Sequence, residues 1–222
     1  MHLQAILFDI DGTLIDTNDL HARCWQEAFE HFGKPLPYDV VRHQIGKGGD
    51  LLVPDLLSAR EMRRFGEELK EYRSRRFKDE YMPKAKPFPG ASETLETLHA
   101  RGLRIALASS ANEDEVEYYV QLLGVEKLIA GSTSKKDAKL SKPSPEIFRA
   151  ALEQTGADEG QTFAVGDTPY DILAAHRIPL PIVAVRSGGF EPELLAKAEF
   201  LFDDITQIVP ELKRLDEYFA DE

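Results

Sequence analysis

Residues 5–16 read AILFDIDGTLID, in which an apolar run delivers two carboxylates, Asp9 and Asp11, into a turn that contains Gly12. The apolar residues 3–8 predict a buried strand. Because side chains alternate along a strand, both carboxylates can project toward one side of its end. Two close carboxylates repel, so both stay ionised only with a cation nearby. One acid of the pair is a candidate nucleophile and the other a candidate general acid or base, or both are candidate metal ligands. A strand that ends in a turn, however, often carries Asp and Gly without either role.

The charge of the chain limits its partners. The 222 residues include 27 Lys and Arg against 39 Asp and Glu, which gives a formal net charge of −12. An acidic chain is a poor electrostatic match for nucleic acid or for an anionic membrane surface. The most basic segment, residues 60–78, is interleaved with acids and is typical of a solvated helix face. We therefore expect no nucleic-acid and no membrane partner.

The cysteine content and the apolar runs bear on the compartment. Cys24 is the only cysteine, so no intrachain disulfide can form, which suits a reducing compartment. The N-terminus lacks the pattern of a secretion signal, and no apolar run approaches the ~20 residues of a membrane span. We expect a cytoplasmic protein, either a monomer or a homodimer.

The order of predicted elements indicates the fold class. Residues 17–85 read as helix and loop, with helices over 18–32, 38–45 and 58–81 and a helix over 51–57 that Pro54 interrupts. After the prolines and Gly90 of residues 83–90, helices and strands alternate, with the strands at 103–108, 128–130, 162–165, 182–185 and 199–202. This alternation predicts an α/β protein. Its core would be a Rossmann-like doubly wound parallel sheet (1–16 and 86–222), interrupted by an inserted all-helical cap domain (17–85).

Three more predicted strand ends carry polar residues. Ser109 and Ser110 follow one strand where a helix begins, a place that suits an anion. Lys142 precedes two prolines that lead into the next helix. Asp167 follows a third strand, with Asp171 four residues later. A helix cap is the alternative for the serines, an ordinary surface charge for Lys142, and a turn with a cap for the two acids.

Taken in order, these motifs resemble the haloacid dehalogenase-like superfamily, especially its capped phosphatases of the phosphoglycolate phosphatase and β-phosphoglucomutase type. The resemblance covers nearly the whole chain. Each motif is weak alone, but together they are specific because each follows a predicted strand or precedes a predicted helix. The motifs are Asp9-Ile10-Asp11-Gly12-Thr13, Ser109, Lys142, and Gly166-Asp167 with Asp171.

The resemblance implies a Mg²⁺-dependent phosphatase that works through an aspartyl-phosphate on a small phosphorylated metabolite, either a sugar phosphate or a phosphoglycolate-like ester. Asp9 would attack phosphorus, and Asp11 would protonate the leaving group and then act as a base. Mg²⁺ would be held by Asp9, Asp167, the Asp11 backbone carbonyl and, as a further or alternate ligand, Asp171. The residues expected to hold the phosphoryl group are Lys142, Ser109, Ser110 and Gly12, with Thr13 as the phosphatase-like residue of the first motif.

A sugar phosphomutase is the first alternative. Residues 16–21 and Trp25 look like the start of a mutase cap, and His21 could contact Asp11 when the cap closes, or could face solvent or the domain interface. Against a mutase, the loop Gly46–Gly49 lacks the arginine of a β-phosphoglucomutase, and Gly166-Asp167 is the phosphatase-like form of its motif.

Two further alternatives stay open. A phosphonate hydrolase needs a cap lysine for a Schiff base, and Lys47 is the candidate; Lys47 could instead contact an anionic or hydroxyl group of the substrate, or be a solvated loop lysine. A non-catalytic binding protein could use the same fold, although it would not need Asp9, Asp11, Lys142 and Asp167 together. Removal of halide is disfavoured because the dehalogenases lack the acid at the position of Asp11.

Overall fold

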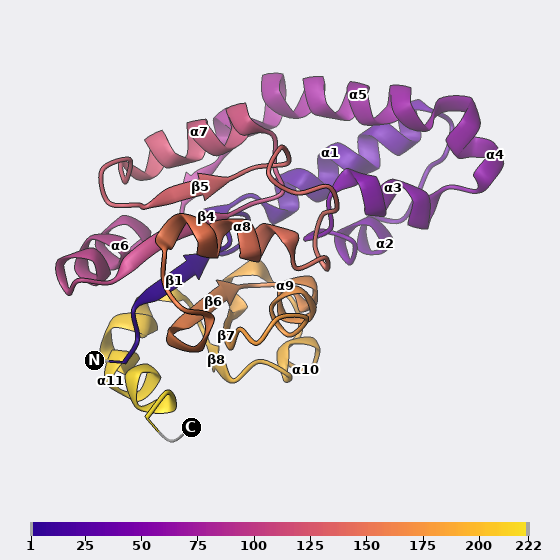
Figure 1. The fold of residues 1–222 in the computed structure, drawn as a ribbon. Coiled ribbons are helices and arrows are strands. Elements are labelled where there is room, and N and C mark those ends of the chain that lie inside the picture. The colour runs from indigo at the N-terminus through magenta and orange to yellow at the C-terminus, as the bar shows by residue number, and fades with distance from the viewer. Residues whose placement is uncertain (1, 221–222) are drawn as a thin grey trace.

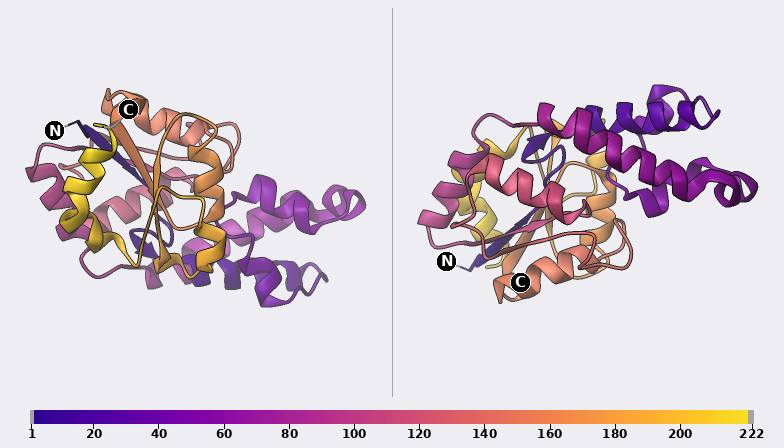
Figure 2. Two further views of the ribbon diagram at one scale, coloured as in Figure 1. Left: turned by 90° about the horizontal axis from the view of Figure 1, so that it is seen from below. Right: turned by 90° about the horizontal axis from the view of Figure 1, so that it is seen from above.

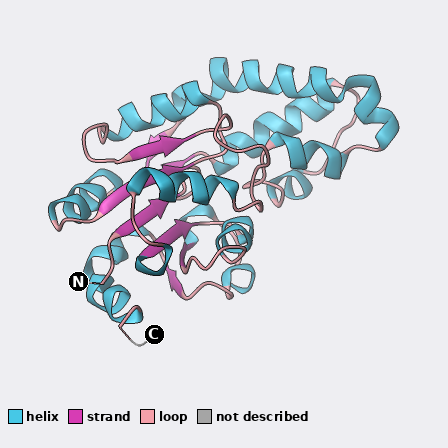
Figure 3. Cartoon of the chain, viewed as in Figure 1, coloured by secondary structure: helices cyan, strands magenta, loops and turns pink. Residues whose placement is uncertain are grey.

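A computed structural model of the protein describes residues 2–220, so residues 1, 221 and 222 of the expected core lie outside it. One sheet of six parallel strands, in the order β5-β4-β1-β6-β7-β8, has helices on both faces (Figures 1 and 3). This confirms the predicted fold class. The strands are β1 (Ala5–Phe8), β4 (Arg104–Ala108), β5 (Gly131–Thr133), β6 (Thr162–Gly166), β7 (Ile182–Val185) and β8 (Phe200–Phe202).

The two faces of the sheet follow from the alternation of side chains along each strand. On β1, Ile6 and Phe8 pack into one core cluster, whereas Leu7 packs into another on the opposite face. Every residue of β1 is buried, which explains why its sequence is continuously apolar. The first face is covered by α6 (Ala91–Ala100), α7 (Glu113–Leu123) and α11 (Ile208–Tyr218), and the second by α8 (Glu146–Thr155), α9 (Pro169–Ala175) and α10 (Pro192–Leu195).

Residues 17–85 form a separate group of helices that projects from one side of the sheet (Figure 2). Their apolar faces meet in a third core cluster, to which α1 contributes Trp25, Ala28 and Phe29 at helical spacing. We call this group the helical segment; its status as a cap domain stays a prediction. It contains α1 (Asn18–His31), α2 (Tyr38–Arg42), α3 (Gly49–Leu56), α4 (Ala59–Glu61), α5 (Glu67–Arg76), the π turns Met62–Gly66 and Phe77–Tyr81, and the 3-10 turn Met82–Lys84.

A two-stranded ribbon joins the helical segment to the sheet. The strands β2 (Ile15–Asp16) and β3 (Lys86–Pro87) pair antiparallel, so the chain leaves and re-enters the core at the same place. The sequence did not predict this ribbon, because two-residue strands show no period and Pro87 has no N–H to donate.

The strand predicted at 128–130 is wrong by a few residues. The paired strand is β5, whereas Leu128 and Ile129 form a turn in which both N–H groups donate to Val125 O. Their side chains pack against the first core cluster, and this packing accounts for the apolar signal that suggested a strand. The predicted helix that Pro54 interrupts is α3, which begins earlier, at Gly49, and keeps Pro54 inside it.

Candidate active site

The carboxyl ends of three neighbouring strands meet at the point where the chain switches from one side of β1 to the other. Asp9 follows β1, Ser109 follows β4 and Asp167 follows β6, so residues far apart in the sequence share one edge of the sheet. Ligands of open parallel sheets bind at this kind of switch point. The structure thus brings together the polar strand ends that the sequence singled out.

Three carboxylates form the centre of this edge. One oxygen from each of Asp9, Asp167 and Asp171 lies within 4.8 Å of the other two, and all three residues are buried. The Asp171 carboxylate also caps α9: its Oδ2 accepts hydrogen bonds from Thr168 Oγ1 (2.6 Å) and from Thr168 N (3.1 Å). Asp171 is therefore both the cap of α9 and a member of the acidic cluster.

Lys142 is the cation closest to this cluster. Its ammonium lies 2.7 Å from Asp171 Oδ1 and also contacts Asp9 Oδ1, and the residue is only 2% exposed. Burial lowers the pKa of Lys142, but the charges and hydrogen bonds of Asp171 and Asp9 raise it by more, so its net pKa lies above the usual range. Lys142 therefore stays charged between the two carboxylates.

One ammonium does not balance three buried acids. Burial raises the pKa of Asp9 well above its ordinary value; Lys142 opposes this rise, while Asp171, Asp167 and Asp11 add to it. Burial raises the pKa of Asp167 to about 7, and repulsion from Asp171 adds to this effect. A cation with oxygen-preferring chemistry would relieve this repulsion, so the donor set fits a metal such as Mg²⁺.

Asp167 is held tightly from the side of α1. Asn18 Nδ2 donates to its Oδ2 (2.7 Å) and Thr13 Oγ1 to its Oδ1 (3.2 Å). Gly12 and Gly188 let the backbone approach, because a Cβ built on either would lie 2.3 Å and 1.7 Å, respectively, from Asp167 Oδ2. The N–H of Gly12 donates to Ile15 O in the turn, and the phosphate-binding role expected for Gly12 stays a prediction.

Asp11 faces the helical segment instead of the acidic cluster. Its Oδ1 accepts hydrogen bonds from Thr17 Oγ1 (2.6 Å) and His21 Nε2 (2.9 Å). Burial would raise the pKa of Asp11, but the contact with His21 and the bond from Thr17 hold it below its ordinary value. Arg73, which can only donate, contacts His21 Nδ1, so Nε2 must carry the hydrogen. The His21 ring stacks on Phe77 with centroids 4.1 Å apart.

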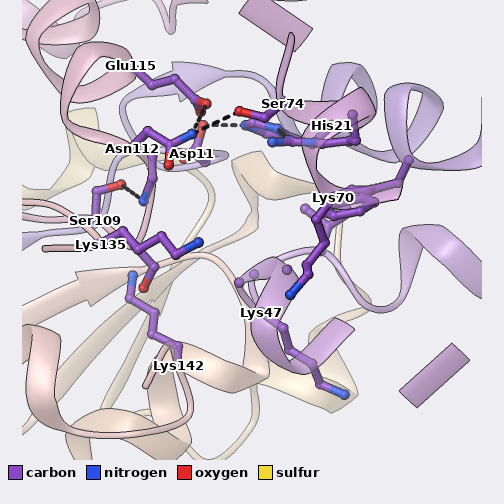
Figure 4. Close-up of a pocket in the computed structure, with 18 of the residues that line it drawn as sticks. Asp11, His21, Lys47, Lys70, Ser74, Ser109, Asn112, Glu115, Lys135 and Lys142 are labelled. Carbon is purple, nitrogen blue, oxygen red and sulfur yellow. Dashed lines mark hydrogen bonds and ion pairs between the residues drawn. The ribbon is translucent and has the colours of Figure 1, made fainter. Parts of the chain in front are cut away.

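A cavity of about 160 Å³ opens between this edge of the sheet and the helical segment (Figure 4). Asp9, Asp11, Ser109, Ser110 and Lys142 line it, and His21 and Lys47 face it from the helical segment. Thr13 is fully buried behind Asp167 instead. The Ser109 hydroxyl accepts from Ala111 N (3.0 Å), and the buried Ser110 hydroxyl has no partner within residues 2–220.

Lys47 is held away from the reacting edge. Its ammonium donates to Asp55 Oδ2 and Gln44 Oε1, both at 2.6 Å, and lies 4.9 Å from the Tyr170 ring centroid. Figure 4 shows it pointing away from Lys142. In the structure the Lys47 ammonium is therefore bound by Asp55 and Gln44, and the substrate-binding role predicted for Lys47 stays a prediction.

Sequence reasoning missed several residues of the site. Asn18 and Thr17 hold the two key carboxylates, and Arg73, Lys70 and Lys135 line the cavity. Asn18 and Thr17 lie close behind the first motif in the sequence, which was a usable signal. The other three look like ordinary charges in the sequence, and only the tertiary fold brings them to the cavity.

The comparisons with known proteins agree with this geometry. A family model described as haloacid dehalogenase-like hydrolase matches residues 6–185. Phosphoglycolate phosphatase of Neisseria meningitidis is 31% identical over 214 residues, which cover 93% of this chain and 88% of that protein. Pyrophosphatase PpaX of Oceanobacillus iheyensis is 26% identical over 211 residues, which cover 94% and 96%.

Solved structures show the same fold. A hydrolase from Pseudomonas syringae matches with a TM-score of 0.85 and 27% identity, over 95% of this chain and 98% of that chain. A β-phosphoglucomutase from Clostridium difficile matches with a TM-score of 0.76 over 99% and 98%, and at 20% identity this likeness shows the fold alone.

The parallel sheet and the acid-and-lysine site at its carboxyl edge agree with the hydrolase family that the comparisons identify. The chain belongs to the haloacid dehalogenase-like hydrolase family, and it is a phosphatase of that family, as the resemblance implied. Within residues 2–220, no helix combines the length and apolar character needed to cross a membrane.

Proposed function

We propose that the protein is a Mg²⁺-dependent phosphatase that hydrolyses a small phosphomonoester, a sugar phosphate or a phosphoglycolate-like ester, through an aspartyl-phosphate on Asp9. The observation that carries the proposal is the placement of Asp9 in the cavity wall, in contact with Lys142 and within 4.8 Å of two further carboxylates. Relatives named phosphoglycolate phosphatase and pyrophosphatase support a small phosphorylated substrate.

In the first step, an oxygen of Asp9 attacks phosphorus, a new O–P bond forms, and the bond from phosphorus to the ester oxygen breaks. Asp11 gives its proton to the departing alkoxide. This transfer requires the protonated carboxyl, whereas the contacts with Thr17 and His21 lower the pKa of Asp11 and favour the ionised form, which is the form that acts as the base in the second step. Lys142 and the Ser109 hydroxyl hold the non-bridging oxygens, where negative charge accumulates.

In the second step, water attacks the phosphorus of the aspartyl-phosphate. Asp11, now ionised, takes the proton from this water, the bond between phosphorus and the Asp9 oxygen breaks, and phosphate is released while the Asp9 carboxylate is regenerated. The same residue therefore serves as acid and then as base, which requires that its carboxylate stay beside the reacting oxygen. The bonds from Thr17 and His21 fix its position.

Asp9, Asp167 and the Asp11 backbone carbonyl would hold Mg²⁺, with Asp171 as a further or alternate ligand. When bound, the ion supplies the positive charge that lets an anionic nucleophile approach an anionic phosphate. The Asp11 side chain lies outside the acidic cluster found within residues 2–220, so its side chain stays free for proton transfer.

The test is Mg²⁺-dependent phosphate release from a panel of phosphomonoesters, with the Asp9→Asn protein as the blank. The panel contains sugar phosphates, phosphoglycolate, nucleotides and phosphonoacetaldehyde. We expect release by the wild-type protein and none by the variant, because an amide cannot form the aspartyl-phosphate. Comparable release by the variant would refute the role of Asp9 as nucleophile.

A sugar phosphomutase is the second candidate, favoured by the contact of His21 with Asp11, which places a residue of the helical segment on the acid. Isomerisation of hexose phosphates without net phosphate release would select this alternative. For the setting, we propose action in the cytoplasm as a monomer or homodimer; the buried free thiol of Cys24 fits a reducing compartment.

A further inference from the structure

Two lysines that the proposed chemistry does not use face the cavity from opposite sides. Lys70 belongs to α5 of the helical segment, and Lys135 follows β5 of the sheet. Both line the cavity that contains Asp9 and Lys142. Figure 4 shows both side chains pointing into the space between Lys142 and the helical segment. Two cations directed at one cavity are unexpected in a chain whose net charge is −12.

Neither lysine is committed to a strong partner. Within residues 2–220, the Lys135 side chain makes no ion pair or hydrogen bond. Lys70 pairs with Glu67 three residues earlier at 2.7 Å, and the Glu67 side chain is 78% exposed. An exposed pair of this kind is weak, so Lys70 can turn to a buried anion at little cost. Lys47, by contrast, is held by both Asp55 and Gln44.

We propose that Lys70 and Lys135 form a second anion-binding subsite, so that the enzyme selects phosphate esters that carry a second anionic group, a carboxylate or a second phosphate. The inference rests on the proposed phosphatase function, because that function puts the phosphoryl group at the Asp9 end of the cavity. The second anion then lies between the helical segment and the loop after β5, bound by Lys70 from one side and by Lys135 from the other (Figure 4). An ester without a second anion leaves Lys135 without a partner and Lys70 with its exposed pair to Glu67.

The first test measures binding without turnover. Titration calorimetry compares 3-phosphonopropionate, which carries a carboxylate, with propylphosphonate, which does not, and methylenediphosphonate represents a second phosphate. We expect the wild-type protein to bind at least one of the two doubly anionic ligands about tenfold more tightly than propylphosphonate, since one charge-assisted hydrogen bond has that effect. Whichever ligand is favoured identifies the second group as carboxylate or phosphate.

The variants assign the subsite to its residues. Lys70→Gln and Lys135→Gln should each lower the ratio of the affinity for the doubly anionic ligand to the affinity for propylphosphonate by about tenfold. The affinity for propylphosphonate itself should stay unchanged. The matched control is Lys136→Gln, because Lys136 pairs with Glu113 and does not line this cavity. Equal affinity of the wild-type protein for all three ligands, or an equal loss for all ligands in both variants, would overturn the subsite.

Turnover separates this inference from the function on which it rests. The matched esters are phosphoglycolate and 2-hydroxyethyl phosphate, compared by kcat/KM in the same variants. Hydrolysis of both esters with no binding preference for a second anion overturns the subsite alone. A binding preference that depends on both lysines, without phosphate release from these two esters or from any member of the panel, supports the subsite and overturns the proposed phosphatase.

Discussion

Asp167→Asn should make the metal-free protein more stable at pH 8, although it removes a charge of the proposed Mg²⁺ site. Asp167 is fully buried beside Asp9 and Asp171, and the ammonium of Lys142 contacts these two neighbours instead of Asp167 itself. Burial, followed by repulsion from Asp171, raises its pKa from the ordinary 3.8 to about 7. A neutral amide removes this repulsion and the cost of burying a charge.

The size of the effect follows from the pKa. One pKa unit corresponds to about 1.4 kcal/mol, so ionised Asp167 costs the folded protein about 4 kcal/mol above pH 7. The amide accepts one hydrogen bond fewer from Asn18 and Thr13, a loss of about 1 kcal/mol. We therefore expect the free energy of unfolding to rise by about 3 kcal/mol at pH 8.

The stabilisation by the amide depends on pH in a defined window. A carboxyl whose folded pKa is raised costs nothing below its unfolded pKa, and the cost grows as the pH rises from 3.8 to about 7. At pH 5 the cost is only about 2 kcal/mol, so the advantage of the variant should shrink to about 1 kcal/mol.

The assay is urea unfolding in the presence of a chelator, at pH 5 and pH 8. The control is Asp158→Asn, an exposed acid whose substitution should change stability by less than about 0.5 kcal/mol. A variant that is less stable than the wild type at pH 8, or a difference that is the same at both pH values, refutes the electrostatic argument. Added Mg²⁺ at about a hundredfold excess over its Kd should stabilise the wild type by about 3 kcal/mol and the variant by much less.

Three further substitutions test neighbouring parts of the site. Gly188→Ala would put a Cβ 1.7 Å from Asp167 Oδ2, so we expect the Mg²⁺ concentration for half-maximal activity to rise by roughly tenfold; an unchanged Mg²⁺ titration would mean that the backbone yields instead. Asp50→Ala removes the bonds to Ser141 Oγ (2.6 Å) and Ser141 N (3.2 Å) beside Lys142, so kcat/KM should fall by about tenfold, and wild-type kinetics would show that the loop holds itself. Lys47→Ala should alter the preference among esters more than activity on a small artificial ester, and an equal loss on every ester would make Lys47 structural or catalytic.

The core of the fold was predictable because its signals are local. The continuous apolar run before Asp9 reflects a strand buried on both faces, and the acids after it mark the carboxyl end of that strand. The ribbon of β2 and β3 was not predictable, because two residues on each side carry no periodic pattern. The apolar residues Leu128 and Ile129 suggested a strand because burial of a turn and burial of a strand select the same side chains.

The residues of the site likewise fall into a group with local sequence signals and a group without them. Asp9, Asp11, Ser109, Lys142 and Asp167 were found because their order matches known motifs at predicted strand ends. The residues from the helical segment carry no such order. Arg73 and Lys70 reach the cavity only because α5 packs against α1 and directs one face toward it, and this depends on the long-range packing of the third core cluster.

The contacts between the helical segment and the sheet connect its position to the chemistry. His21 bonds Asp11, Asn18 bonds Asp167, and Asp50 bonds Ser141 directly before Lys142. Each contact therefore ends on a residue of the proposed machinery or on its immediate neighbour. A displacement of the helical segment would break the hydrogen bond from His21 to the Asp11 carboxylate. It would also break the hydrogen bonds from Ser141, directly before Lys142, to Asp50. We therefore expect the position of the helical segment to be coupled to the assembly of the site, and a ligand that binds Lys70 and Lys135 together to favour the assembled state.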